Sequence, residues 1–167
     1  MAERPNETHT ISLLVNNKPG VLIRIALVFS RRGYNLESVV VSPSHDPMFS
    51  RMNLVASGDP ATLDQIIKQL GKLVDVIHAR DHTGENILQR ELALIKVTCP
   101  PQKRSEILEI ANHFKCQSLD ISEKTMTFQV TGTTEKLNAL HSMMTTYGII
   151  ESVRSGKLIM ARGAEQT

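Results

Sequence analysis

The segment Asn17-Lys18-Pro19-Gly20-Val21-Leu22 has the residue types of a small anion-binding site. Pro19 fits the first position of a helix, where no N–H is needed, and Gly20 has no Cβ to keep a ligand away. The backbone amides of Gly20, Val21 and Leu22 would then be unpaired donors at a helix start. A carboxylate fits there, and the helix dipole favours it by about 0.3–1 kcal/mol.

The flanking segments are those that such a loop requires. Residues 11–15 read as a largely buried strand, and residues 21–29 are too apolar and too long for another turn. A plain turn accounts for the same loop, because Pro-Gly is common turn chemistry and Asn17 is a typical cap residue. Taken alone, the loop favours a plain turn, and other observations have to decide between a turn and an anion-binding site.

Composition excludes several classes of function. The chain has 167 residues, 41% of them hydrophobic, which is enough for the core of one domain or two small ones. Its formal net charge of +2 comes from interspersed charges and predicts no polyanionic partner. Residues 1–8 lack the apolar core of a signal peptide, and no apolar run reaches the ~20 residues of a membrane span. We therefore expect a cytoplasmic protein that binds neither nucleic acid nor membrane.

The cysteines and histidines do not predict a metal site. Cys99 and Cys116 are too few for a disulfide scaffold and lack CxxC spacing, so we expect reduced packing thiols. The histidines are scattered, without HxxxH or HExxH spacing.

The order of expected elements indicates two βαββαβ units, an α+β fold with two ferredoxin-like units in tandem. The first is expected as a strand over 11–15, a helix over 21–29, strands over 36–41 and 49–56, a helix capped by Asp59, and a strand over 73–79. The second is expected as a strand over 91–98, a helix over 105–114, strands over 117–122 and 125–131, a helix over 134–146, and a strand over 149–154. The domains are then 1–79 with 1–8 flexible, a polar linker over 80–90, and 91–167 with a flexible tail.

Matching residues support an internal repeat. Ile25-Ala26-x-x-Phe29 recurs as Ile110-Ala111-x-x-Phe114, and in this register Gly20 falls opposite Ser105. The second copy has therefore lost the bare backbone at its helix start. Any anion-binding loop should belong to the first unit only.

Two other functions share this order of elements. An RNA-recognition module needs stacking aromatic side chains, which residues 11–15 lack. An acylphosphatase-like hydrolase needs an arginine in its anion-binding loop, and the nearest one, Arg24, falls inside the expected helix.

Several longer motifs resemble one family, the small, regulatory subunits of acetohydroxyacid synthase, also called acetolactate synthase. They are Asn17-x-Pro19-Gly20-Val21-Leu22, the stretch 29–38, Asp46-Pro47, Ser50-Arg51-Met52, the stretches 69–76 and 90–97, and Arg154-Ser155-Gly156 with Arg162-Gly163. The resemblance covers residues 9–163. The first unit alone would suggest only an ACT domain, an amino-acid-sensing module, so the alternative is an ACT-type sensor that regulates a different enzyme.

The resemblance implies a chain with no active site and no cofactor of its own. In the family a catalytic large subunit carries thiamine diphosphate, a divalent metal and FAD, and condenses two pyruvates, or pyruvate with 2-oxobutyrate. The small subunit raises that activity and confers feedback inhibition by valine, an end product of branched-chain amino acid biosynthesis. Its ACT domains pair side by side in a homodimer.

The resemblance also implies an effector site between two paired ACT units. Carried over by position, it consists of Asn17, Gly20, Val21 and Leu22 of one unit with Asn35 and Leu36 of its neighbour. These residue types suit a free amino acid. Backbone amides take the carboxylate, Asn35 accepts from the ammonium group, Leu36 lies near the branched side chain, and Asn17 either braces the loop or contacts the ligand.

Overall fold

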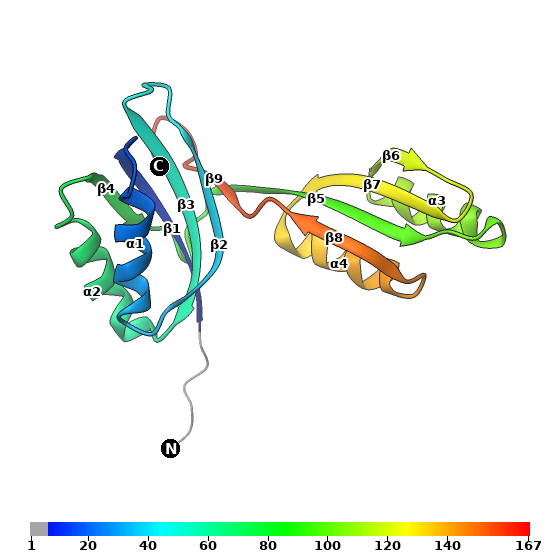
Figure 1. Cartoon of the computed structure of the whole chain (residues 1–167), viewed down its shortest axis with the longest axis horizontal. Helices are drawn as coiled ribbons and strands as arrows, with labels where there is room; N and C mark the ends of the chain where they lie inside the picture. The colour runs from blue at the N-terminus through cyan, green and yellow to red at the C-terminus, as the bar shows by residue number, and fades with distance from the viewer. Residues whose placement is uncertain (1–6) are drawn as a thin grey trace, which may run out of the picture. The chain divides into compact units, whose positions relative to one another are not determined.

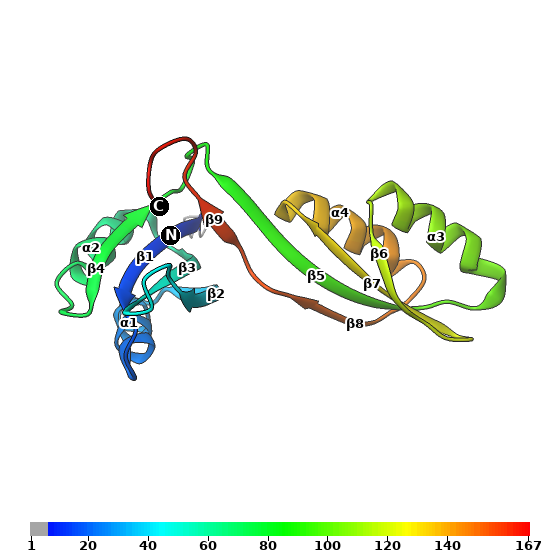
Figure 2. The same cartoon turned by 90° about the horizontal axis from the view of Figure 1, so that it is seen from above.

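The computed structural model describes residues 7–167, which divide into two compact units (Figure 1). The first contains the chain up to Leu88 together with Lys157–Thr167, and the second is Gln89–Gly156. In each unit two helices cover one face of an antiparallel sheet (Figures 1 and 2). No helix among the described residues is long and apolar enough to cross a membrane.

The first unit has the βαββαβ order expected from the sequence. Its elements are β1 (Glu7–Asn16), α1 (Val21–Ser30), β2 (Asn35–Pro43), β3 (Phe49–Gly58), α2 (Pro60–Leu70) and β4 (Val76–Asp81). The sheet order is β2-β3-β1-β4, with neighbouring strands antiparallel. This is the ferredoxin-like arrangement, so the expectation of an α+β fold is confirmed.

Burial explains why these segments adopt these structures. Ile11, Leu13 and Val15 alternate along β1 and are at most 2% exposed, as expected for a strand with one face against helices. Val21, Ile25 and Phe29 recur every four residues along α1 and form its buried stripe. These residues belong to the core that fills the space between the helices and the sheet.

The second unit repeats the order. It contains β5 (Leu88–Thr98), a short 3-10 helix η1 (Pro101–Lys103), α3 (Arg104–His113), β6 (Gln117–Ile121), β7 (Thr125–Gly132), α4 (Thr134–Thr145) and β8 (Ile149–Arg154). Its strands β6-β7-β5-β8 follow one another in the same sheet order as the first unit. Ile95, Ile107 and Phe128 are among the residues of its separate core.

The expected boundaries need three corrections. Most of the expected flexible start lies outside the described residues, but Glu7 and Thr8 belong to β1, where they pair with Gly58 and Ser57. Strands occupy both ends of the expected linker 80–90, because β4 runs to Asp81 and β5 starts at Leu88. The expected tail, which includes β9 (Leu158–Met160), belongs to the first unit.

The register of the internal repeat also differs from the expected one. The ends of α1 and α3 carry the same hydrogen bond, because Tyr34 N donates to Phe29 O and Cys116 N donates to Ala111 O. Phe29 therefore corresponds to Ala111, and Ile25 corresponds to the buried Ile107 rather than to Ile110. The structure thus aligns the two helices three residues away from the alignment given by matching letters. Packing against the sheet decides this register, and sequence identity between the copies is too low to reveal it.

Candidate effector-binding site

The loop after β1 is held by hydrogen bonds to two neighbouring segments. Asn16 N donates to Asp75 O at 2.8 Å, and Asn17 N donates to Met48 O at 2.8 Å. The side chain of Asn17 also donates, from Nδ2 to Pro47 O at 3.1 Å. Asn17 is therefore not a helix cap. It braces the loop against the β2–β3 connection, which is one of the two roles expected for it.

Gly20 is the residue that shapes the loop. It precedes α1 as its N-cap with φ of 83° and ψ of −9°, which is the left-handed region. Val21 N lies 3.5 Å from Lys18 O, so residues 18–21 have the form of a type II turn, in which proline suits the second position and glycine the third. The expectation that Pro19 is the first helical residue is therefore wrong. The left-handed Gly20 separates it from the helix.

The start of α1 presents backbone donors to solvent. The first amides of a helix have no acceptor within the helix. Within residues 7–167 the N–H groups of Gly20 and Leu22 have no acceptor outside it either, and that of Val21 has only the 3.5 Å contact. A side chain at Gly20 would meet Arg24, because a Cβ there would lie 3.2 Å from Arg24 Nη1. Glycine is thus favoured by the backbone conformation, and a side chain there would also require the Arg24 guanidinium to shift slightly.

Arg24 adds a cation that the sequence reasoning missed. Its guanidinium forms an ion pair with the carboxylate of Asp75, which also accepts a hydrogen bond from Asn16 Nδ2 at 3.2 Å. The hydrogen bond from Asn16 and the Arg24 guanidinium hold the pKa of Asp75 below its usual value. The sequence does contain a signal for the position of Arg24, which is its spacing of four residues from Gly20. Side chains on a helix lean toward its N-terminal end, so Arg24 reaches back over the start of α1.

The structure does not bring Asn35 and Leu36 to this loop within one chain. Asn16 pairs with Phe49 at one end of β3, whereas Asn35 pairs with Ser57 at the other. Leu36 is half-buried against the core of its own unit. Gly20 and Asn35 also lie at opposite ends of α1, which is about 15 Å long.

Asn35 belongs to a small polar cluster that contains a carboxylate. Asn35 Nδ2 donates to Glu37 Oε1 at 2.8 Å, and Ser57 Oγ donates to the same oxygen at 2.7 Å. These two hydrogen bonds, the one from Ser57 first, lower the pKa of Glu37. Since Nδ2 is engaged, the Oδ1 oxygen of Asn35 is the atom available to accept from a ligand.

An apolar surface runs along the edge of the first unit, and we call it the edge surface. It consists of Ile23 and Leu27 on α1 with Val39 and Val41 on β2, which are 39–67% exposed. Val39 pairs with Leu54 and so faces the helix side of the sheet. β2 is the last strand on its side of the sheet, so its outer edge is open.

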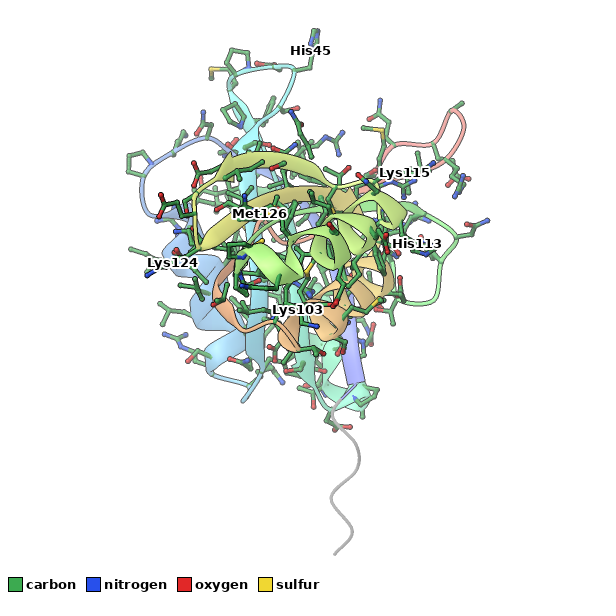
Figure 3. All side chains as sticks on the ribbon, turned by 90° about the vertical axis from the view of Figure 1, so that its right-hand side faces the viewer. His45, Lys103, His113, Lys115, Lys124 and Met126 are labelled. Atoms are coloured by element: carbon green, nitrogen blue, oxygen red, sulfur yellow. The ribbon has the colours of Figure 1, made fainter. Side chains whose placement is uncertain are left out.

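The second unit has no equivalent of Gly20. Lys103 is the N-cap of α3 and has φ of −101°, outside the left-handed region. Figure 3 shows Lys103 and His113 at the two ends of this helix. Ser105, which the letter match placed opposite Gly20, lies inside α3. Confinement of ligand binding to the first unit remains a prediction that these differences support.

The expected linker contains a buried histidine that sequence reasoning did not single out. His82 is 1% exposed, with Nε2 2.8 Å from Ser12 Oγ and Nδ1 2.7 Å from Glu85 Oε2. The hydrogen bond to His82, followed by that from Arg80, lowers the pKa of Glu85. No local pattern marks such a residue as buried, because its partner Ser12 is 70 positions away.

The two cysteines have the environments of packing residues. Cys99 is buried, Cys116 is half-buried, and both are free. Burial raises the pKa of the Cys116 thiol, which makes it less reactive. Among the described residues, no group of three or more histidine, cysteine and acidic side chains could hold a metal ion.

Comparisons with known proteins agree with the motifs. One family model, described as an AHAS small subunit-like ACT domain, matches residues 11–78, and another, described as the small subunit of acetolactate synthase, matches residues 90–163. The chain is 45% identical over 155 residues to a probable acetolactate synthase small subunit of Archaeoglobus fulgidus, covering 93% of this chain and 97% of that protein. It is 44% identical over 156 residues to the acetolactate synthase small subunit of Mycolicibacterium smegmatis, covering 93% and 92%.

A solved structure is similar over almost the whole chain. The crystal structure of the acetolactate synthase small subunit from Thermotoga maritima superposes with a TM-score of 0.84 at 34% identity. The match covers 95% of this chain and 99% of that one. Both units therefore have the fold of that small subunit.

Proposed function

The chain belongs to the family of acetolactate synthase small subunits, and from this premise we propose that it activates a catalytic large subunit and makes it sensitive to valine. The large subunit would carry thiamine diphosphate, a divalent metal and FAD, and would condense two pyruvates, or pyruvate with 2-oxobutyrate. This chain would supply no catalytic group and no cofactor. We place the complex in the cytoplasm.

The observation that carries the proposal is the left-handed Gly20 at the start of α1. Unpaired amides of Gly20 and Leu22 suit a carboxylate, and the guanidinium of Arg24 adds a nearby positive charge. An amino acid also needs a partner for its ammonium group. Asn35 Oδ1 and the neighbouring Glu37 provide acceptors of the right kind, but at the far end of the unit.

A homodimer resolves this separation. Pairing two β2 strands antiparallel would set the start of β2 in one chain beside the end of β2 in the other. Pro43 at that end pairs with Ser50, next to Phe49, which pairs with Asn16. The neighbour's Asn35 would therefore approach the loop 17–20. The edge surface would be covered at the same time, which supports this mode of pairing.

Valine bound between two chains would favour one pairing geometry, and the large subunit would respond to it. A ligand shifts such an equilibrium only by its preference for one state over the other. Regulation of this kind typically needs a coupling of about 1–3 kcal/mol between sites. Contacts from two chains to one small ligand supply that preference, since the complete site exists only in one arrangement.

Reconstitution tests the proposal directly. The purified chain is mixed with a purified large subunit, and acetolactate formation is measured with and without valine. We expect the chain to raise the rate and valine to reduce it. Leucine and isoleucine serve as competing effectors. No activation and no response to any of the three amino acids would reject the proposed function.

A further inference from the structure

Two adjacent arginines, Arg31 and Arg32, lie at the end of α1 and take no part in the proposed effector site. Arg31 is the C-cap of α1, and Arg32 precedes Gly33, which has φ of 72°. Backbone hydrogen bonds close this helix end, because Arg32 N and Tyr34 N both donate to Phe29 O. The end of α1 therefore does not need the two guanidinium groups as hydrogen-bond donors.

The side chain of Arg32 is held in place by two glutamines of α2. Arg32 Nε donates to Gln69 Oε1 at 3.3 Å, and Arg32 Nη1 donates to Gln65 Oε1 at 2.5 Å. The two glutamines are four residues apart and so lie on the same face of the helix. Both acceptors are neutral amide oxygens, so they orient the guanidinium without compensating its charge. Two of its five N–H groups are engaged, and three remain for a ligand.

The two arginines line an open hollow between the end of α1 and helix α2. It has a volume of about 510 Å³ and is lined by Arg31, Arg32, Thr62 and Gln69. These residues all belong to the first unit, in which α1 and α2 lie side by side on one face of the sheet (Figures 1 and 2). None of the lining residues is acidic. The hollow therefore combines two positive charges with a hydroxyl and an amide group.

The carboxylates near the hollow are engaged elsewhere. Asp64 forms an ion pair with Lys68, with 2.6 Å between the oxygen and the nitrogen. Asp59 caps α2, accepting from Ala61 N at 3.3 Å and from Thr62 Oγ1 at 3.4 Å. Among residues 7–167, neither arginine of the hollow forms an ion pair with a carboxylate. The charge of these two guanidinium groups is thus available to an anion.

We propose that this hollow binds the phosphate group of a small molecule. Arginine pairs with phosphate through two parallel N–H···O bonds, and a phosphate group carries about two negative charges near neutral pH. Two guanidinium groups match both its charge and its several acceptor oxygens. A volume of about 510 Å³ also leaves room for an organic part beside the phosphate, since small-molecule sites span about 300–1,000 Å³. The hollow lies at the opposite end of α1 from Gly20, so the proposal does not depend on the valine site.

Titration calorimetry with the full chain tests this proposal. Pyrophosphate and ribose 5-phosphate are separate probes, which distinguish an inorganic phosphate from a phosphate ester. We expect at least one of them to bind, with one molecule per chain. Arg32→Gln should weaken this binding about tenfold or more, because hydrogen bonds from a charged group are lost.

Gln69→Glu separates the charge of the hollow from its shape. This change keeps Arg32 and an acceptor for its Nε, but it places a carboxylate beside the guanidinium. We expect a loss of affinity of about tenfold here as well. Arg31→Gln provides a further test if Arg32→Gln does not fold, because Arg31 is exposed and its change disturbs no interaction with α2.

Three control variants accompany these measurements. Arg90→Gln and Gln117→Glu make the same changes of charge at exposed positions of the second unit, and both should bind the probes as the wild type does. Gly20→Asp separates the hollow from the loop 17–20, whose free amides also suit an anion. Phosphate binding should be unchanged in this variant.

Each contrary outcome is distinct. Equal affinity in the wild type and in the folded Arg32→Gln and Gln69→Glu variants overturns the proposal. Affinity lost in Gly20→Asp but kept in Arg32→Gln also overturns it, because the anion would then bind at the loop. Absence of binding of both probes to the wild-type chain rejects the hollow as a phosphate site and leaves the proposed response to valine untouched.

Discussion

Arg24 and Asp75 form an ion pair that ties the first turn of α1 to the residue just before β4. Asp75 is shared, because it accepts from Asn16 through its side chain at 3.2 Å and through its backbone oxygen at 2.8 Å. The pair keeps a guanidinium beside Gly20 even without a ligand. The loop is therefore preorganised, with one cation and several backbone donors in place.

Replacing Arg24 with Gln should weaken valine binding. A hydrogen bond to a charged group contributes about 1.5–3 kcal/mol, and the 48% exposure of this side chain places the effect at the low end, about tenfold in affinity. Calorimetry with valine and with valinamide measures it. The amide has no carboxylate, so its binding should not change. Equal losses for both ligands would contradict a carboxylate contact and indicate a structural role only.

Gly20→Asp should abolish measurable valine binding. The substitution puts a carboxylate where the ligand carboxylate would lie, and its Cβ would approach Arg24 Nη1. Gly84→Ala controls for backbone strain, because Gly84 also has positive φ, 76°, but open space around it. Ser105→Asp controls for the second unit. A large loss of affinity in Ser105→Asp would contradict the confinement of the site to the first unit.

Local residue types predict the helices and strands of the first unit, but they do not predict the conformation of the loop 17–20. Pro19 suits a helix start and the second position of a type II turn equally well. The deciding contacts come from Asp75 and Met48, which are far away in sequence. Asp59, by contrast, caps α2 as expected, accepting from Ala61 N at 3.3 Å, because this contact is local.

Long-range polar contacts account for the other differences. His82 lies in the polar segment 80–86, and it is buried where its side chain contacts Ser12. The segment 157–167 reads as a tail because Arg51, the hydrogen-bond partner of Thr167, is 116 residues away in sequence. Hydrophobic periodicity identifies strands and helices, but it carries no information about such pairings.

Asn35→Ala should weaken valine binding through the neighbouring chain. The side chain lies at the opposite end of the unit from Gly20, so one chain cannot form both halves of a site. Mixing Gly20→Asp and Asn35→Ala chains tests this arrangement. Each mixed dimer should contain one intact site, formed by the loop of one chain and Asn35 of the other. Failure of the mixture to recover any valine binding would contradict a site shared between chains.

Breaking the contact between His82 and Ser12 should destabilise the first unit. Ser12→Ala leaves a buried imidazole nitrogen without its partner, which typically costs about 1–3 kcal/mol. Chemical denaturation measures the change in the free energy of unfolding. Tyr34 and Tyr147 lie one in each unit, so a Tyr147→Phe background lets tyrosine fluorescence report on the first unit alone. His78→Ala, at an exposed position of β4, should have little effect.

Acid should destabilise the first unit through Asp75 and Glu85. Both carboxyl groups have lowered pKa values in the folded chain, Asp75 through Asn16 and then Arg24, and Glu85 through His82 and then Arg80. Their stabilising contribution is therefore complete above the pKa of an unfolded carboxyl group, about 4, and is lost as the pH falls through the lower folded values. Denaturation of the Tyr147→Phe chain between about pH 6 and 3 measures this loss. In the double variant Asp75→Asn with Glu85→Gln, the free energy of unfolding should fall less steeply as the pH decreases. Asp120→Asn, at an exposed position of β6 in the second unit, should leave this pH dependence unchanged. An equally steep fall in the double variant would show that other groups cause the pH dependence.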